Sequence, residues 1–119
     1  MVLVLFEVMV KRNCMDSYLT LAANLKQELM KAEGFIRSER FTSLANEGKL
    51  LSLSVWENEE AVNKWRNQAA HRASQKQGRN SMFESYNITV ASKIRSYSDE
   101  GRSEAPEDSN QFFHQPIWP

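Results

Sequence analysis

The sequence predicts an α+β domain of the ferredoxin-like type, in which an antiparallel sheet carries two helices on one face. Strand-like and helix-like patterns of apolar side chains follow one another in the order β-α-β-β-α-β along the chain, which predicts this fold. The chain contains no internal repeat. A chain of 119 residues can also bury only one hydrophobic core of useful size. One sheet with two helices fits that limit.

The strands follow from their side-chain patterns. Residues 2–10 are almost continuously apolar, which predicts a central strand that is covered on both faces. Residues 35–44 and 49–57 alternate in polarity and flank a turn that ends at Gly48, so they predict a hairpin. Residues 82–97 alternate again and predict the last strand, with an irregularity near its start.

Two amphipathic helices connect these strands. In residues 16–32 apolar side chains recur at steps of three and four, and Gly34 supplies a left-handed stop. A second helix is predicted from Asn58, whose side chain can cap free backbone amides, to Gly78. The inward face of this helix is expected to consist of Val62, Trp65, Ala69 and Ala73.

The composition changes after Ser98. Residues 1–98 carry the predicted domain, and residues 99–119 form a C-terminal extension. The first part of the extension, SDEGRSEAPEDSN, is polar and is predicted to carry no regular structure. Its end, QFFHQPIWP, is rich in aromatic side chains, which are expected to dock on the same subunit or a neighbour unless the end is a flexible tail.

Charge and cysteine content exclude several classes of function. Fifteen acidic residues balance fifteen basic ones, so no nucleic-acid partner is expected. The single cysteine, Cys14, cannot form an internal disulfide and fits a cytoplasmic location. Residues 2–10 are too short to span a membrane and lack the features of an export signal. No metal-ligand spacing, phosphate loop or serine elbow is present, so no metal or cofactor is expected.

The uncovered face of the predicted sheet indicates a protein partner. Strands with apolar side chains on a face that no helix covers need a second surface, and a second copy of the chain is the simplest one. We therefore expect a homodimer through the open sheet face. Glu7, Glu39 and Arg40 lie on predicted strands and are expected to form ion pairs within the sheet or across the dimer.

The segment AVNKWRNQAAHRASQKQGR, residues 61–79, contains the main candidates for a functional site. Trp65 is expected to line the core or a pocket, and His71 is the only imidazole of the predicted domain, suited to proton transfer near neutral pH. On a continuous helix these two residues lie about 120° apart, so that His71 faces outward or along the edge. A break at residues 67–70 would instead turn His71 and Arg72 toward a cleft beside Trp65.

Several segments, in order and spacing, resemble the antibiotic biosynthesis monooxygenase (ABM) family: ERFTSL, GKLLSLSVW, EEAVNKWRN, HRASQ, GR and YNITVA. The resemblance covers about residues 2–97. It implies a dimeric α/β barrel of ferredoxin-like domains. Some members oxygenate small aromatic polyketides without metal or flavin, through a substrate carbanion that passes an electron to oxygen. Trp65 matches the family's second-helix tryptophan, and His71 falls at the place of a tyrosine in a cofactor-free oxygenase.

Two positions depart from the family pattern. Ala61 stands where that oxygenase has an asparagine, and Glu7 or a neighbour stands where haem-degrading members have a first-strand asparagine. The haem-ligating histidine of those members also lies farther beyond the tryptophan than His71 does. The resemblance therefore disfavours haem degradation.

The leading hypothesis is a homodimeric, cofactor-independent monooxygenase that acts on a small aromatic or quinol-type substrate. Its cleft is expected between the sheet and the helices, with Trp65 in its wall and His71 as the base. The candidate substrate contacts are Arg72, Tyr86, Phe41 and Trp56. The alternative is a non-catalytic or stress-responsive dimeric barrel that binds a small apolar ligand.

Overall fold

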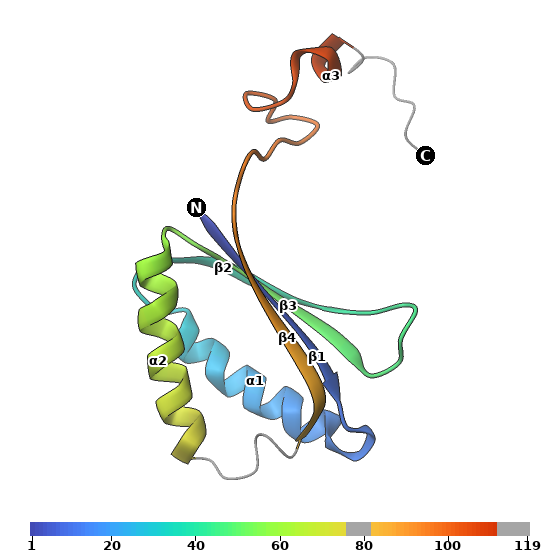
Figure 1. The fold of residues 1–119 in the computed structure, drawn as a ribbon, viewed down its shortest axis with the longest axis vertical. Helices are drawn as coiled ribbons and strands as arrows, with labels where there is room; N and C mark the ends of the chain where they lie inside the picture. Colours follow the sequence, from blue (N-terminus) through green and yellow to red (C-terminus); the bar gives the residue numbers. More distant parts are fainter. Residues whose placement is uncertain (76–81, 112–119) are drawn as a thin grey trace.

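In the computed structural model, four strands form one antiparallel sheet and two long helices cover one of its faces (Figure 1). The structure describes residues 1–75 and 82–111, and of residues 70–75 only the backbone. The aromatic end at 112–119, for which docking was predicted, lies outside the described residues. The main elements are β1 (Val2–Val10), α1 (Met15–Leu29), β2 (Phe35–Thr42), β3 (Lys49–Trp56), α2 (Glu59–Gln75) and β4 (Phe83–Ser92).

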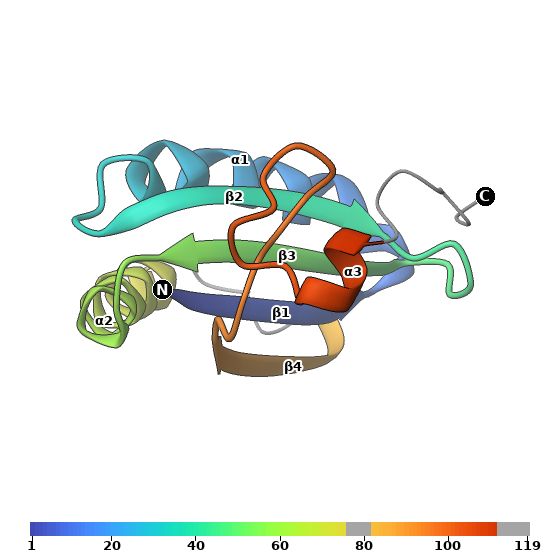
Figure 2. The same cartoon turned by 90° about the horizontal axis from the view of Figure 1, so that it is seen from above.

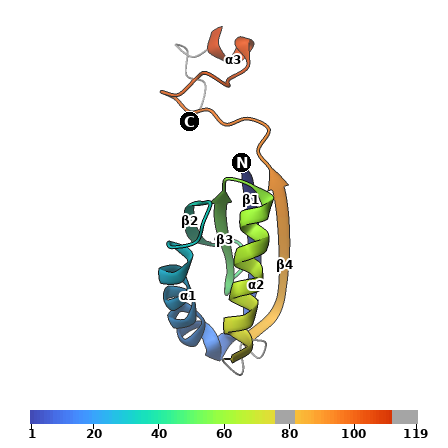
Figure 3. The ribbon, with the colours of Figure 1, turned by 90° about the vertical axis from the view of Figure 1, so that its left-hand side faces the viewer.

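The strand order is β2-β3-β1-β4, and every neighbouring pair is antiparallel (Figure 2). Helices α1 and α2 lie on the same side of the sheet (Figure 3). The predicted ferredoxin-like α+β fold is therefore confirmed. In a single chain the sheet is open and is not closed into a barrel.

Two small clusters of buried side chains attach the helices to opposite ends of β1. One joins Val8 and Val10 to Tyr18 and Ala22 of α1. The other joins Trp56 of β3 to the start of α2, with the first residues of β1 packed against it. Because the core is divided in this way, the space between the two clusters is left for a cleft.

Among the described residues, three boundaries differ by two residues or more from those predicted. Helix α1 ends at Leu29 and not at residue 32, and β2 ends at Thr42 and not at residue 44. Strand β4 ends at Ser92. The Lys93 amide still donates to the Met1 carbonyl, and beyond this bond the chain leaves the sheet. The irregularity predicted near the start of β4 is confirmed, since the register with β1 shifts between Met9 and Val10.

A short helix, α3 (Glu107–Gln111), corrects the prediction that the polar extension carries no regular structure. Figure 1 shows it at the end of the described part of the extension, apart from the sheet. Arg102 orders this segment, because its guanidinium donates to Asn110 Oδ1 at 3.0 Å and to Ser109 Oγ at 2.6 Å. The same guanidinium lies 5.1 Å from the centre of the Tyr97 ring. These contacts join residues too far apart in sequence for composition to reveal them.

Gly34 and Gly48 both have the positive φ that the sequence predicted for their turns, +81° and +83°. They differ in their surroundings. A Cβ at Gly34 would lie 2.5 Å from the Cβ of Ala61 in α2, whereas a Cβ at Gly48 would meet its nearest atom at 3.5 Å. Gly34 therefore permits both a left-handed turn and the close approach of α2.

We expect Gly34→Ala to lower the free energy of unfolding by about 3 kcal/mol and Gly48→Ala to lower it by about 1 kcal/mol. Both variants strain a left-handed backbone, but only Gly34→Ala also forces α2 away from the sheet. Urea unfolding followed by circular dichroism measures both losses. Equal losses would contradict the close packing of α2 against Gly34.

Candidate functional site

A cleft of ≈ 390 Å³ lies between the sheet and the two helices. All four strands contribute side chains to its floor, and α1 and α2 form its walls. Most of the lining is apolar, and the polar side chains are few. A cleft of this kind, with mostly apolar walls and a few polar groups, is typical of sites for small molecules.

Two tryptophans form one end of the cleft. Trp65 of α2 and Trp56 of β3 both line it, with ring centres 6.3 Å apart. Trp56 is almost fully buried, and its Nε1 donates to Ser54 Oγ at 2.9 Å. Phe35 packs edge-on against its other side at 5.5 Å. Trp56 is therefore a fixed support, and Trp65 is the half-buried aromatic that a ligand would meet.

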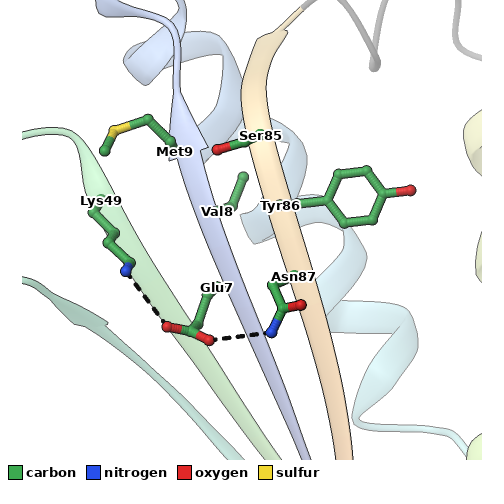
Figure 4. Close-up of a pocket in the computed structure, with 7 residues that line it drawn as sticks. All are labelled: Glu7, Val8, Met9, Lys49, Ser85, Tyr86 and Asn87. Carbon is green, nitrogen blue, oxygen red and sulfur yellow. Dashed lines mark hydrogen bonds and ion pairs between the residues drawn. The ribbon is translucent and has the colours of Figure 1, made fainter.

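The other two aromatic candidates do not line the cleft. Phe41 is 42% exposed, and its pairing with Leu51 places it on the face away from the helices. Tyr86 is 61% exposed, and its ring packs at the edge of the cleft, 5.9 Å from the Phe6 ring. Figure 4 shows that ring pointing away from Glu7. The structure thus brings Trp56 and Trp65 together, leaves Tyr86 at the edge and excludes Phe41.

His71 and Arg72 lie on α2, but their side chains are outside the described residues. The helix is continuous to Gln75, so the break considered at residues 67–70 does not occur. At 100° per residue, position 71 lies about 120° around the axis from Trp65, and position 72 only about 20° from it. The proposed roles of His71 and Arg72 stay predictions.

Glu7 forms the predicted ion pair within the sheet, on the face away from the helices (Figure 4). Lys49 Nζ of β3 lies 3.5 Å from Glu7 Oε1, and Asn87 Nδ2 of β4 donates to Glu7 Oε2 at 3.4 Å. These residues border a shallow hollow of ≈ 260 Å³ on that face. The carboxylate of Glu7 is therefore neutralised by its neighbours and does not reach the cleft.

Arg40 differs from the prediction, because it lines the cleft and forms none of the ion pairs among the described residues. Its Nε is buried and has no hydrogen-bond partner there. Its Cζ lies 6.0 Å from the centre of the Tyr18 ring, which also lines the cleft from α1. Sequence analysis therefore missed an arginine–tyrosine pair inside the site.

Tyr18 is a buried titratable group, with 6% of its surface exposed. Burial raises the pKa of its hydroxyl, because the phenolate would lose its hydration. The positive charge of Arg40 and a hydrogen bond from its guanidinium to the hydroxyl oppose this rise without cancelling it. Tyr18 therefore stays protonated and neutral through the physiological pH range.

A signal for this pair was present in the alternation of the hairpin. Ser38 and Arg40 of β2 pair with Ser54 and Ser52 of β3, and all four line the cleft. The sequence showed that these residues share a face. It did not show which face the helices cover.

Among residues 1–75 and 82–111, no group of three or more histidine, cysteine, aspartate or glutamate side chains is placed to hold a metal ion. Cys14 is half-buried, and its thiol donates to Asn13 Oδ1 at 3.5 Å. In the same part of the chain, no helix has the length and apolar character needed to cross a membrane.

The fold and the cleft define a ferredoxin-like α+β protein with a largely apolar cleft lined by two tryptophans. The sequence profile of the family "Antibiotic biosynthesis monooxygenase" matches residues 1–77, which is 77 of the 119 residues. The chain belongs to this family, as its motifs indicated.

One curated relative is the jasmonate monooxygenase ABM of Pyricularia oryzae, which is 39% identical over 87 residues. The match covers 73% of this chain and 40% of that protein. A second, an uncharacterised Bacillus subtilis protein, is 36% identical over 45 residues, which are 38% of this chain and 40% of the relative. The chain thus spans about two fifths of the length of the curated relatives it matches.

Solved structures share the fold at low sequence identity. A Mycobacterium tuberculosis protein has a TM-score of 0.70 at 14% identity, covering 82% of this chain and 98% of its own. SnoaB, a cofactor-independent oxygenase from Streptomyces nogalater, has a TM-score of 0.68 at 10% identity, covering 80% and 94%. At these identities the likeness extends to the fold alone.

We expect Tyr18→Phe to reduce the loss of stability that the protein undergoes in alkali. The pKa of Tyr18 in the folded state lies above the ordinary value of 10.0, so above that pH the unfolded chain releases a proton that the folded chain retains. The contribution of the protonated Tyr18 to the free energy of unfolding is therefore complete below pH 10 and is lost as the pH rises through its folded-state pKa.

Urea unfolding of the wild type and Tyr18→Phe at a series of pH values on both sides of 10.0 measures this difference. The free energy of unfolding should fall less steeply with pH in the variant. Parallel curves for the two proteins would contradict the burial of the Tyr18 hydroxyl in the folded state.

Proposed function

We propose that this protein is a homodimeric, cofactor-independent monooxygenase that acts on a small aromatic or quinol-type substrate. The observation that carries this proposal is the largely apolar cleft, in which Trp65 stacks near Trp56 and a few polar side chains line the floor. Membership of the ABM family and the relation to a jasmonate monooxygenase support an oxygenase class of reaction.

The apolar walls would favour this chemistry in two ways. They reduce the contact of a substrate carbanion with water, and they strengthen the few polar interactions inside the cleft. A base removes a proton from a substrate carbon, and the carbanion passes one electron to dioxygen. The two radicals then combine in a carbon–oxygen bond, and loss of water from the protonated hydroperoxide leaves a carbonyl group. One dioxygen is consumed for each ketone and water formed.

In this proposal Trp65 shapes the cleft against the substrate ring, and His71 is the base. Arg72, whose position on α2 lies near that of Trp65 around the helix axis, is a candidate polar contact. The geometry of a continuous helix places position 71 on a different side of α2 from Trp65. The assignment of the base therefore depends on a direct test.

We expect metal-free protein to consume oxygen with one or more anthrones, naphthols or hydroquinones. His71→Ala should lower the rate by about tenfold or more, because loss of a general base typically costs at least that much. Trp65→Phe should lower turnover without lowering the melting temperature. Asn67→Ala, which changes an exposed polar residue on the same helix, is the matched control and should keep the wild-type rate.

An oxygen electrode measures these rates against a control without protein. Unchanged uptake in His71→Ala would remove His71 as the base and leave the oxygenase. Unchanged turnover in Trp65→Phe would remove Trp65 from the reaction. No uptake with any substrate of the panel would contradict the oxygenase itself.

A second candidate is a non-catalytic barrel that binds a small apolar ligand. Ala61 favours it, because this residue is buried against the turn at Gly34 and offers no polar group at the position where the cofactor-free oxygenase has asparagine. A protein of this kind would show quenching of Trp65 fluorescence by the ligand, lost in Trp65→Phe, and would leave the ligand unchanged in air.

The open face of the sheet supports the homodimer in this proposal. Leucines of the two central strands lie half-buried on that face, and none of the described helices covers it. They are Leu3, Leu5, Leu51 and Leu53. A second copy would bury this apolar surface and bring two sheets face to face. The single cysteine, Cys14, supports a cytoplasmic location.

We expect the wild type to sediment as a dimer and Leu53→Asp to sediment as a monomer, because a carboxylate would be buried without a partner at the centre of the interface. Leu19→Asp is the matched control, since Leu19 is 41% exposed on α1 and lies away from the open face. Analytical ultracentrifugation distinguishes the two states. A monomeric wild type would overturn the proposed dimer.

A further inference from the structure

We propose that Arg40, with the serine hydroxyls beside it, forms an anion-binding site inside the cleft. The ligand would then be an apolar molecule with one anionic oxygen group, either a carboxylate or an ionised enol or phenol. This inference rests on the proposed function for the apolar part of the substrate, and it adds the chemical class of the polar part.

The floor of the cleft has two chemically different halves. The half formed by β1 and β4 is apolar and contains Val4, Phe6, Ile88 and Val90. The half formed by β2 and β3 is polar next to Trp56, and contains Ser38, Arg40, Ser52 and Ser54. Directly paired residues on one face of a sheet lie about 5 Å apart, so Arg40 is adjacent to Ser52. A ligand across the floor would place its ring on β1 and β4 and its polar group beside Arg40.

Arg40 has no carboxylate at ion-pair distance among the described residues. None of the ion pairs in the described part of the chain includes it, and its buried Nε has no hydrogen-bond partner there. A guanidinium that is partly withdrawn from water without a counter-charge destabilises the fold. Its planar set of donors matches a carboxylate or an enolate oxygen. An anionic ligand would supply the counter-charge that the described part of the chain does not.

The charges around the cleft also favour an anion. Of the four charged residues that line it in the described part of the chain, three are basic, namely Lys26 of α1, Arg40 of β2 and Arg66 of α2, and the fourth is Glu39. Lys26 and Arg66 are exposed, whereas Arg40 is partly buried. Basic residues on both walls raise the local concentration of anions, and the one on the floor can hold them.

Tyr18 is the positioning residue of this site. It is packed in the core cluster with Val8 and Ala22, and Phe83 lies edge-on against its ring at 5.5 Å. Because Tyr18 is fixed, its ring and hydroxyl hold the Arg40 guanidinium in place beside the floor. A positive charge held there would stabilise the ionised form of an acidic substrate, and so it would assist the loss of a proton in the proposed reaction.

The experiment compares ligands of one shape that differ in charge. Naphthoate, naphthalenemethanol and naphthol are titrated into the full chain without oxygen, and tryptophan fluorescence reports binding. We expect naphthoate to bind about tenfold or more tightly than naphthalenemethanol. Arg40→Met should abolish this preference while changing the binding of the neutral alcohol by less than about twofold. Tyr18→Phe should reduce the preference to an intermediate value.

Arg37→Met is the matched control, because Arg37 is an exposed arginine on the opposite face of the same strand. It should keep the full preference for naphthoate. Arg40→Lys should keep part of it, since the charge remains but the planar donors are lost. Arg40→Met should not lower the melting temperature, because it removes a partly buried charge that has no counter-charge among the described residues. If Arg40→Met fails to fold, Arg40→Lys and the wild-type preference decide the question.

Naphthol, titrated below and above its own ionisation, separates the two sources of the anion. Tighter binding of naphthoate alone assigns the site to carboxylates, and tighter binding of ionised naphthol alone assigns it to enolates. Equal binding of charged and neutral probes by the wild type, or a preference that survives in Arg40→Met, would overturn the site.

The outcome is independent of turnover. Oxygen uptake by a protein without a preference for anions would overturn the anion site and leave the oxygenase. A preference for anions in a protein that consumes no oxygen would overturn the oxygenase and leave the anion site.

Discussion

The register of β1 against β3 and β4 determines which side chains enter the cleft. Side chains alternate between the two faces of a sheet, so a shift by one residue would exchange every inward side chain for an outward one. In the observed register Glu7 lies on the outer face beside Lys49, and Phe6 lies on the inner face opposite Ser52. Through β3, the same register sets Arg40 on the inner face. The carboxylate of Glu7, which is paired, and the guanidinium of Arg40, which has no ion pair among the described residues, thus lie on opposite faces of the sheet.

The cleft persists because the helices are held to the sheet at two separate places. At one end, the turn at Gly34 allows α2 to pack closely through Ala61. At the other end, Tyr18 and Ala22 anchor α1 against Val8. Between these contacts three serines of β2 and β3 occupy the floor beside Arg40 and Trp56. Small polar residues on a strand therefore create the volume that a ligand can occupy.

Sequence reasoning predicted the fold well, because each element has a clear period and a suitable turn. It also placed Trp65 correctly, since one helical stripe contains Val62, Trp65 and Ala69. It failed to assign the inner face of the hairpin, because alternation alone does not show which face a distant helix covers. That single uncertainty misplaced Phe41 and hid Arg40.

Two other differences between prediction and structure have separate causes. The possible break in α2 did not occur, because Ala69 and Ala70 belong to the residue type that favours a helix most. The short helix α3 was missed, because Arg102 orders it from a distance through side-chain hydrogen bonds. At α3 the sequence contained the residues but did not show which side chains would meet.

The inward side of β4 has a consequence for ligand exchange. Ile88 and Val90 line the cleft, yet they are 54% and 50% exposed, so the cleft is open to solvent along this edge strand. A ligand can therefore enter and leave sideways across β4 while α1 and α2 remain attached to the sheet. The residence time of a ligand would then depend on how well its apolar part covers these two side chains.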